Sequence, residues 1–195
     1  MLNLLYLLKS HRVFEAAIAA AIVIMIYTAA RVIFLKAKKL PRKPMNEEIC
    51  RALLAGYFAA LVMMVWFPWD ELRFIRSGMI KSWADLIEIG DYTNNMWLWG
   101  VLSGKLHDGY IVFELLANVA LFVPYGFLIP MIWRKLKWWA VWLICLGTTA
   151  AVELLQPLVA RTGDLDDVLT NFIGGIIGCS IAKLILKIIN SRKTA

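Results

Sequence analysis

Five apolar segments dominate this sequence, and each of them is long enough to cross a lipid bilayer. They span about residues 13–35, 49–67, 110–130, 138–159 and 168–189, and a helix needs roughly 20 residues to cross the hydrocarbon. A bilayer offers no water to unpaired backbone groups, so segments of this length form helices. Hydrophobic residues make up 61% of the chain, more than one soluble core of this size could bury. The sequence therefore predicts an all-α polytopic membrane bundle of about five transmembrane helices, forming a single domain over residues 1–195.

The distribution of lysine and arginine predicts the orientation of this bundle. Basic residues gather after the first segment, between the third and fourth, and in the C-terminal tail, and cytoplasmic connections carry such an excess. We therefore expect the N-terminus outside and the C-terminus inside. The same clustering explains the net charge of +7 without a nucleic-acid partner. The basic residues concerned are Lys36, Lys38, Lys39, Arg42, Lys43, Arg51, Arg134, Lys135, Lys137, Lys187, Arg192 and Lys193.

Two further segments are predicted to lie along the membrane surface. Residues 1–8 are apolar but too short to span, which indicates a short interfacial helix. In the outer loop of residues 69–109, apolar side chains recur at helical spacing from Leu72 to Ile87. This pattern predicts an amphipathic helix that lies on the outer leaflet or caps the bundle, as a surface helix or as a gate for a substrate.

Polar side chains interrupt the last three apolar segments near their predicted outer ends. Glu114 and Asn118 are four residues apart and share a helix face, and Glu114 would lie about 6 Å deep at about 1.5 Å per residue. Glu153 and Gln156 share a face of the next segment. In the last segment, Asp164, Asp167 and Asn171 follow one stripe, preceded by Arg161. Charged groups inside a membrane are costly and mark functional sites. We therefore predict one polar pocket in the outer leaflet, with Arg161 at its rim.

Purely structural interpretations of these residues stay open. Asp164 and Asp167 could cap the last helix, and Glu153 could pair with Arg161 to lock the bundle. Asn118 and Asn171 could join helices by ordinary hydrogen bonds. A stripe of small residues, Gly174, Gly178 and Ala182, predicts the close approach of another helix. The cysteines Cys50, Cys145 and Cys179 show no metal or disulfide spacing and are interpreted as small core residues.

The C-terminal half resembles the VanZ-like family of bacterial membrane proteins. The resemblance rests on three blocks over about residues 113–180: NVALFVPYGFLIP from Asn118, Glu153 with Gln156, and RTGDLDDVLTNFIGGIIG from Arg161. The family takes its name from a teicoplanin resistance factor. Membership implies a multi-pass protein of the bacterial plasma membrane with a role at the cell envelope. The positions that the resemblance implies are Asn118, Pro124, Gly126, Glu153, Gln156, Arg161, Asp164, Asp167, Asn171 and Gly178.

The sequence favours a non-enzymatic function for this pocket. A membrane lipid, a lipid-linked cell-wall precursor or another amphiphile would bind there, which could lower susceptibility to glycopeptide or lipoglycopeptide antibiotics such as teicoplanin. Arg161 would pair with a phosphate or carboxylate of the ligand. The predicted ligand-binding residues are Glu114, Asn118, Glu153, Gln156, Arg161, Asp164, Asp167 and Asn171.

The alternative is a membrane enzyme, a hydrolase or transferase acting on a polyprenyl-linked or lipid-linked envelope substrate. Glu114 or Glu153 would then act as a base, and Asp164 with Asp167 could hold a divalent cation. No histidine lies near the pocket in sequence, and no serine or cysteine has a base at motif spacing. The sequence therefore predicts no catalytic residue, metal site or cofactor. A transporter has less support, because five spans without inverted repeats are few; a homo-oligomer stays open.

Overall fold

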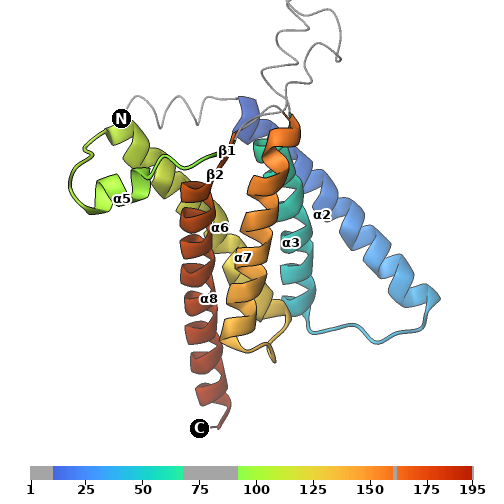
Figure 1. Cartoon of the computed structure of the whole chain (residues 1–195). Coiled ribbons are helices and arrows are strands. Elements are labelled where there is room, and N and C mark those ends of the chain that lie inside the picture. Colours follow the sequence, from blue (N-terminus) through green and yellow to red (C-terminus); the bar gives the residue numbers. More distant parts are fainter. Residues whose placement is uncertain (1–10, 68–91, 160–161, 195) are drawn as a thin grey trace, which may run out of the picture.

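The computed structural model of the chain describes residues 11–67, 92–159 and 162–194, and these residues form a bundle of long helices (Figure 1). Five of the helices are long and apolar enough to cross a membrane, which confirms the predicted all-α membrane bundle. The elements are α2 (His11–Ala37), α3 (Met45–Val65), β1 (Tyr92–Thr93), α5 (Trp97–Leu102), α6 (Gly109–Ile132), α7 (Trp138–Leu155), the 3-10 helix η2 (Gln156–Val159), β2 (Gly163–Asp164) and α8 (Leu165–Thr194).

The helix ends agree with the predicted segments to within five residues, and prolines explain two of the details. Pro124 and Pro130 both lie inside α6, so neither ends the third span; transmembrane helices tolerate proline where neighbouring helices pack against the freed backbone groups. By contrast, α7 ends at Leu155 and the chain tightens into η2, which contains Pro157. The absent N–H of Pro157 ends the α-helical pattern at this point.

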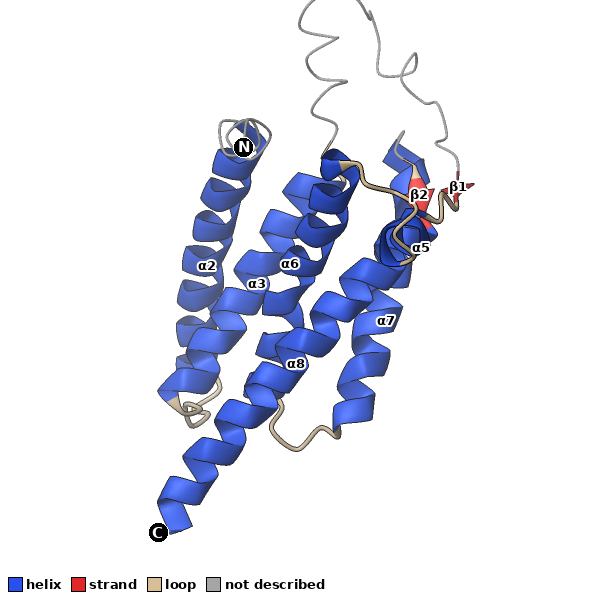
Figure 2. Cartoon of the chain, turned by 90° about the vertical axis from the view of Figure 1, so that its left-hand side faces the viewer, coloured by secondary structure: helices blue, strands red, loops and turns tan. Residues whose placement is uncertain are grey.

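Helix α6 is the centre of the bundle, and its closest neighbour is α8 (Figure 2). A Cβ atom added to Gly174 would overlap the carbonyl oxygen of Val119, and one added to Gly178 would overlap that of Val123. The two backbones therefore touch along this stripe, and Ala182 continues it fully buried. The predicted packing role of the glycine stripe is confirmed, with α6 as the partner helix.

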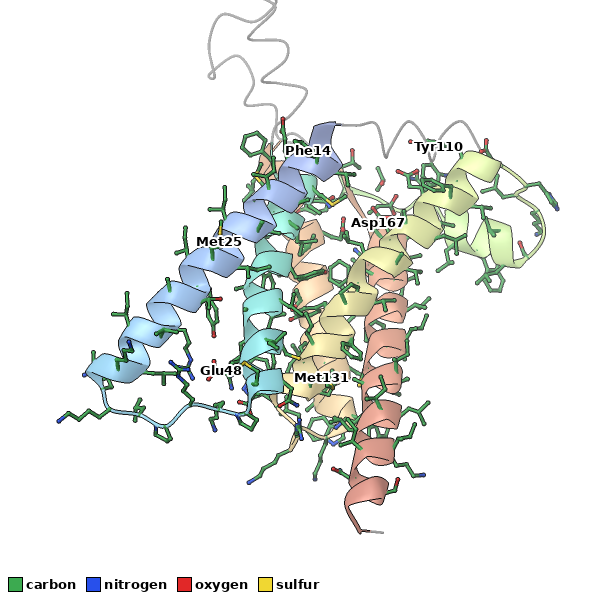
Figure 3. The ribbon with its side chains drawn as sticks, turned by 180° about the vertical axis from the view of Figure 1, so that it is seen from behind. Phe14, Met25, Glu48, Tyr110, Met131 and Asp167 are labelled. Carbon is green, nitrogen blue, oxygen red and sulfur yellow. The ribbon has the colours of Figure 1, made fainter. Side chains whose placement is uncertain are left out.

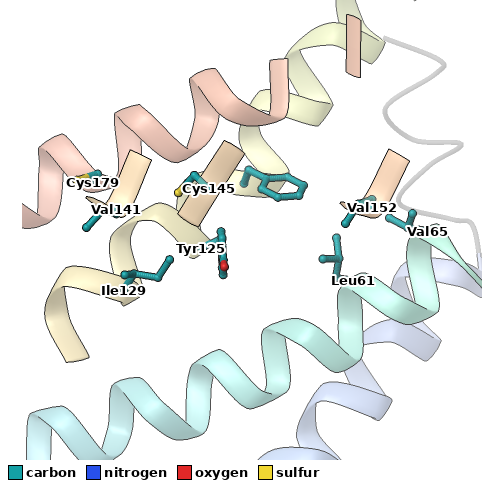
Figure 4. Close-up of a cluster of buried hydrophobic side chains, with 9 residues drawn as sticks. Leu61, Val65, Tyr125, Ile129, Val141, Cys145, Val152 and Cys179 are labelled. Atoms are coloured by element: carbon teal, nitrogen blue, oxygen red, sulfur yellow. The ribbon is translucent and has the colours of Figure 1, made fainter. Parts of the chain in front are cut away.

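A mixed apolar core joins α3, α6, α7 and α8 (Figure 4). Cys145 and Cys179 lie in it with free thiols, and Cys50 is buried in a second cluster against α6 and α8. The prediction that the three cysteines are core residues is confirmed. The members of the first cluster are Leu61, Val65, Phe122, Tyr125, Ile129, Val141, Cys145, Val152 and Cys179.

The outer surface of the helices is apolar, as lipid requires. Large exposed side chains follow α2, including Phe14 and Met25 (Figure 3). The connections α2–α3 and α6–α7 lie at the same end of the bundle as the C-terminus (Figure 1). The three basic segments therefore gather at one end, which we call the basic end. Its location in the cytoplasm stays a prediction, as does the outer location of the opposite end.

Some predictions fall outside the described residues. They are the interfacial helix of residues 1–8 and the whole of the predicted amphipathic helix in the outer loop, from Leu72 to Ile87. The later part of that loop contains a short helix, α5, and the strand β1, which pairs in parallel with β2. Neither β1 nor β2 was expected.

Candidate functional site: a polar cavity between four helices

A cavity of about 360 Å³ opens between α3, α6, α7 and α8, at the end of the bundle opposite the basic end. Its wall combines amide and carboxylate groups with apolar side chains. Six of the eight predicted ligand-binding residues line it, so the convergence inferred from helix depth is present in the structure. The lining residues are Met64, Val65, Glu114, Asn118, Leu121, Phe122, Val152, Glu153, Gln156, Thr162, Asp167 and Asn171.

On one side of the cavity, a hydrogen bond joins α6 to α8. The Asn118 side-chain nitrogen donates to Asp167 Oδ1 over 2.5 Å, although the residues are 49 positions apart in the sequence. Glu114 lies one helical turn before Asn118 and also lines the cavity, half-buried. The Asp167 carboxylate therefore joins two transmembrane helices at the wall of the cavity; Figure 3 shows Asp167 between α6 and α8.

The opposite wall is organised by Glu153, which is 4% exposed. Its Oε1 accepts a hydrogen bond from Gln156 Nε2 (3.2 Å), and its Oε2 accepts one from the backbone N–H of Asp164 (3.2 Å). A Cβ on Gly163 would lie 2.6 Å from the carbonyl oxygen of Glu153, so the chain can return this closely only with glycine. Glu153 thus ties the end of α7 to the strand that leads into α8.

Asp164 has a different role from Asp167. Its Oδ1 accepts from the backbone N–H of Asp166 (3.0 Å), the geometry of a helix N-cap. Its Oδ2 accepts from Thr93 (3.1 Å) and Asn95 (2.7 Å). The capping interpretation therefore holds for Asp164, whereas Asp167 bonds across to α6. The structure places the Asp164 carboxylate on the segment 92–97, outside the lining of the cavity.

The neighbouring Asp166 holds the same segment. It is 4% exposed, and its Oδ2 accepts a hydrogen bond from the backbone N–H of Trp97 over 2.6 Å. Together, Asp164 and Asp166 fasten β1 and the start of α5 to the N-terminus of α8. Sequence reasoning missed Thr93, Asn95 and Asp166, because these contacts join residues about 70 positions apart and no periodicity marks them.

Asp164→Ala is expected to release the segment 92–102 from the bundle. The change removes the acceptor of Thr93 and Asn95 together with a helix cap, which we expect to lower the free energy of unfolding by about 2 kcal/mol. Amide hydrogen exchange over residues 92–102 should rise. Asp108→Ala is the matched control, because it removes the cap of α6 and leaves the contacts of Asp164 in place. Equal exchange in the two variants would contradict the assignment.

Asn171 carries a buried polar atom at the cavity. The residue is 3% exposed and lines the cavity, yet its Oδ1 has no hydrogen-bond partner among the residues that the structure describes. Buried polar atoms are nearly always paired, and each exception needs an explanation. The interpretation of the asparagines as interhelical contacts therefore fits Asn118 and does not explain Asn171.

The cavity is rich in hydrogen-bond acceptors. Three carboxylates (Glu114, Glu153 and Asp167) line it, and no lysine, arginine or histidine does so within the described parts of the chain. Those parts also hold no group of three or more His, Cys, Asp or Glu side chains placed to bind a metal ion. Arg161 lies outside the described residues, so its predicted place at the rim and its pairing with Glu153 stay predictions. A cavity lined by three carboxylates suits a ligand group that donates hydrogen bonds.

A comparison with known protein families finds a match that covers the cavity. The VanZ/LLP1 family pattern matches residues 54–187, which contain every residue that lines the cavity. The chain belongs to the VanZ/LLP1 family. The match begins in α3 and so extends well before about residue 113, where the resemblance in the sequence begins; α2 lies outside it.

A relative from Enterococcus faecium supports the same assignment. Protein VanZ from that organism is 28% identical to this chain over 150 residues, which are 76% of this chain and 83% of Protein VanZ. No solved structure matches the chain. The family resemblance inferred from the three sequence blocks is therefore confirmed, and this VanZ-family chain is a multi-pass membrane protein.

Proposed function

We propose that this VanZ-family protein binds an amphiphilic or lipid-linked ligand, with the polar head of the ligand in the cavity. The observation that supports this most directly is the Oδ1 of Asn171, a buried acceptor in the wall of a cavity of about 360 Å³ that no described residue pairs with. A donor on the ligand would satisfy it. An acceptor left unpaired in the folded state costs about 1–3 kcal/mol, which binding would recover.

The wall of the cavity suits an amphiphile. Met64, Val65 and Leu121 supply apolar surface beside the polar groups, and an amphiphile presents both kinds of surface at once. The acceptors favour hydroxyl, amide or amine donors in the head group. We propose Arg161, which precedes the lining residue Thr162 in the sequence, as an additional contact for a phosphate or carboxylate.

The predicted orientation places this cavity in the outer leaflet of the bacterial plasma membrane. Lipid-linked cell-wall precursors and the apolar tails of lipoglycopeptides occur in that leaflet. We propose that occupancy of the cavity lowers the susceptibility of the cell to glycopeptide or lipoglycopeptide antibiotics such as teicoplanin. The resemblance to the family that is named for teicoplanin resistance supports this extension.

Asn171→Leu tests the binding proposal and separates it from a structural role. The substitution removes an unpaired acceptor, so we expect the free energy of unfolding in detergent to stay unchanged or to rise by up to about 1 kcal/mol. Native mass spectrometry of the purified protein should show an amphiphile of defined mass that co-purifies with the wild type and is missing from Asn171→Leu, whereas a lipid bound outside the cavity should appear with both proteins.

Two variants complete this experiment. Asn46→Leu changes an exposed asparagine at the start of α3, far along the helix from the cavity, and should keep the amphiphile. Asn118→Leu should lose stability, because it leaves the Asp167 carboxylate without its donor. If Asn171→Leu were strongly destabilised and kept the bound amphiphile, Asn171 would be structural and the proposal would fail.

An enzyme remains the second candidate, because the Glu114 carboxylate lines the cavity without a hydrogen-bond donor from any described residue. In this alternative, Glu114 acts as a base on a lipid-linked substrate. Glu114→Gln keeps the size of the side chain and removes the base. Turnover of a polyprenyl-linked substrate by the wild type, lost in Glu114→Gln while the substrate still binds, would favour the enzyme over the binding protein.

A further inference from the structure

The basic end of the bundle contains a second cavity, between α2 and α3. The two helices touch near the middle of the bundle, where a Cβ on Gly56 would lie 2.6 Å from Ile24 Cγ1 and 3.1 Å from the carbonyl oxygen of Ala20. From this contact the helices diverge toward the connection that joins them (Figures 1 and 3). The result is a wedge-shaped cavity, narrowest at Gly56 and widest near the connection of residues 38–44.

The wedge encloses about 400 Å³ and is lined mainly by apolar side chains. Helix α2 supplies one wall and α3 the other, and two basic residues of the connection stand at the mouth. Its lining residues are Ile24, Tyr27, Thr28, Arg31, Val32, Leu35, Arg42, Lys43, Met45, Glu48, Ile49, Ala52 and Leu53. All of them precede residue 54, where the family match begins, so this wedge lies outside the matched region.

An ion pair crosses the mouth of the wedge. Arg31 donates from Nε to Glu48 Oε2 and from Nη2 to Glu48 Oε1, each over 3.1 Å. The backbone N–H of Lys43 also donates to Glu48 Oε1 (3.3 Å), which holds the connection close to α3. Arg31 and Glu48 neutralise each other, so the remaining charge at the mouth comes from other residues.

Arg42 and Lys43 supply that charge. Both are exposed, and no carboxylate of the described residues forms an ion pair with either of them. The wedge therefore has mainly apolar walls formed by two membrane-spanning helices, and two cationic side chains at its wide end. Basic pockets between transmembrane helices bind anionic lipid head groups, and an apolar gap in a bilayer is filled by an acyl chain.

We propose that the wedge between α2 and α3 binds one anionic phospholipid. An acyl chain lies between the helices below the contact of Ile24 with Gly56, and the phosphate lies against Arg42 and Lys43. The proposal is independent of ligand binding in the polar cavity, because the two sites share no residue and lie at opposite ends of the bundle.

Native mass spectrometry of the full chain tests this assignment. The detergent-purified protein is titrated with phosphatidylglycerol or with phosphatidylcholine of the same acyl chains. We expect one phosphatidylglycerol to bind in preference to phosphatidylcholine. The double variant Arg42→Gln/Lys43→Gln should weaken phosphatidylglycerol binding by about tenfold to thirtyfold, since each cation near a membrane surface contributes about 1 kcal/mol.

The double variant Lys38→Gln/Lys39→Gln is the matched control. It removes the same charge from the same connection at residues that do not line the wedge, and should leave the affinity unchanged. Ala52→Phe fills the space between the helices with a larger side chain and should abolish binding, although every basic side chain of the connection is still present. Millimolar inorganic phosphate should not displace the lipid, because free phosphate gains nothing from the apolar walls.

Three outcomes would overturn the proposal. Equal weakening by the two double variants would show binding to general surface charge. Unchanged binding by Ala52→Phe, with circular dichroism showing an intact fold, would place the lipid elsewhere. Displacement by inorganic phosphate would show an anion site that needs no acyl chain. None of these results depends on the Asn171 experiment, so the two proposals fail separately.

Discussion

The double variant Gly174→Ala/Gly178→Ala is expected to lose about 4 kcal/mol of unfolding free energy, since each overpacked site costs about 1–3 kcal/mol; this is the largest stability effect that we predict. Each new Cβ would overlap a backbone carbonyl oxygen of α6, of Val119 and Val123 respectively. Backbone cannot move aside as a flexible side chain can, so α6 and α8 must separate. Their separation would also break the hydrogen bond from Asn118 to Asp167 and open the cavity.

Gly147→Ala is the matched control for this prediction. Gly147 lies inside α7, and no atom of a neighbouring described helix lies within 4 Å of where its Cβ would be. Because alanine forms helices better than glycine, this variant should be neutral or more stable by up to about 1 kcal/mol. Thermal or denaturant unfolding in one detergent compares the three proteins. A loss in Gly147→Ala as large as in the double variant would mean that the close approach of α6 and α8 is not the cause.

Glu153→Ala is expected to have the second-largest effect, a loss of about 2–3 kcal/mol together with the loss of ligand binding. Both oxygens of the buried carboxylate accept hydrogen bonds, one from Gln156 and one from the backbone of Asp164. Removing the side chain leaves two donors without these bonds and enlarges the cavity. The return of the chain from α7 to α8 would then be held less firmly.

Glu153→Gln gives an intermediate step that a simple packing role would not produce. Glutamine has nearly the same size but only one acceptor oxygen, so it can satisfy one of the two donors and must present its amide nitrogen to the other. We expect a loss of about 1–2 kcal/mol. The order wild type, Gln, Ala in unfolding free energy should be paralleled by increasing hydrogen exchange at residues 163–166. Equal stability of wild type and Glu153→Gln would show that one of the two hydrogen bonds contributes nothing.

The two cavities suggest a division of this molecule into two parts. The region of residues 54–187, which matches the VanZ/LLP1 family, contains the polar cavity and the glycine contacts of α6 with α8. Helix α2 and the first part of α3 lie before it and form the wedge. Changes in the wedge should therefore leave the polar cavity intact, and changes at Asn171 should leave the wedge intact.

The sequence by itself determined the helices and the group of polar residues. Apolar length decides which segments cross a membrane, and this is a local property of about 20 consecutive residues. Helical spacing then placed Glu114 with Asn118, and Glu153 with Gln156, on shared faces near one end of their spans. Because the spans alternate in direction, their polar ends had to meet at one depth. The small residues Gly174 and Gly178 also predicted a close contact with another helix.

Only the tertiary structure decided how each polar group is used. Sequence spacing treats Asp164 and Asp167 alike, yet one caps α8 and holds the segment 92–97 while the other bonds to α6. The unpaired oxygen of Asn171 and the divergence of α2 from α3 are equally invisible in the sequence. Such features depend on which helices are neighbours, how each is rotated and how closely their backbones approach. Those quantities arise from contacts between residues far apart in the chain, and no local pattern encodes them.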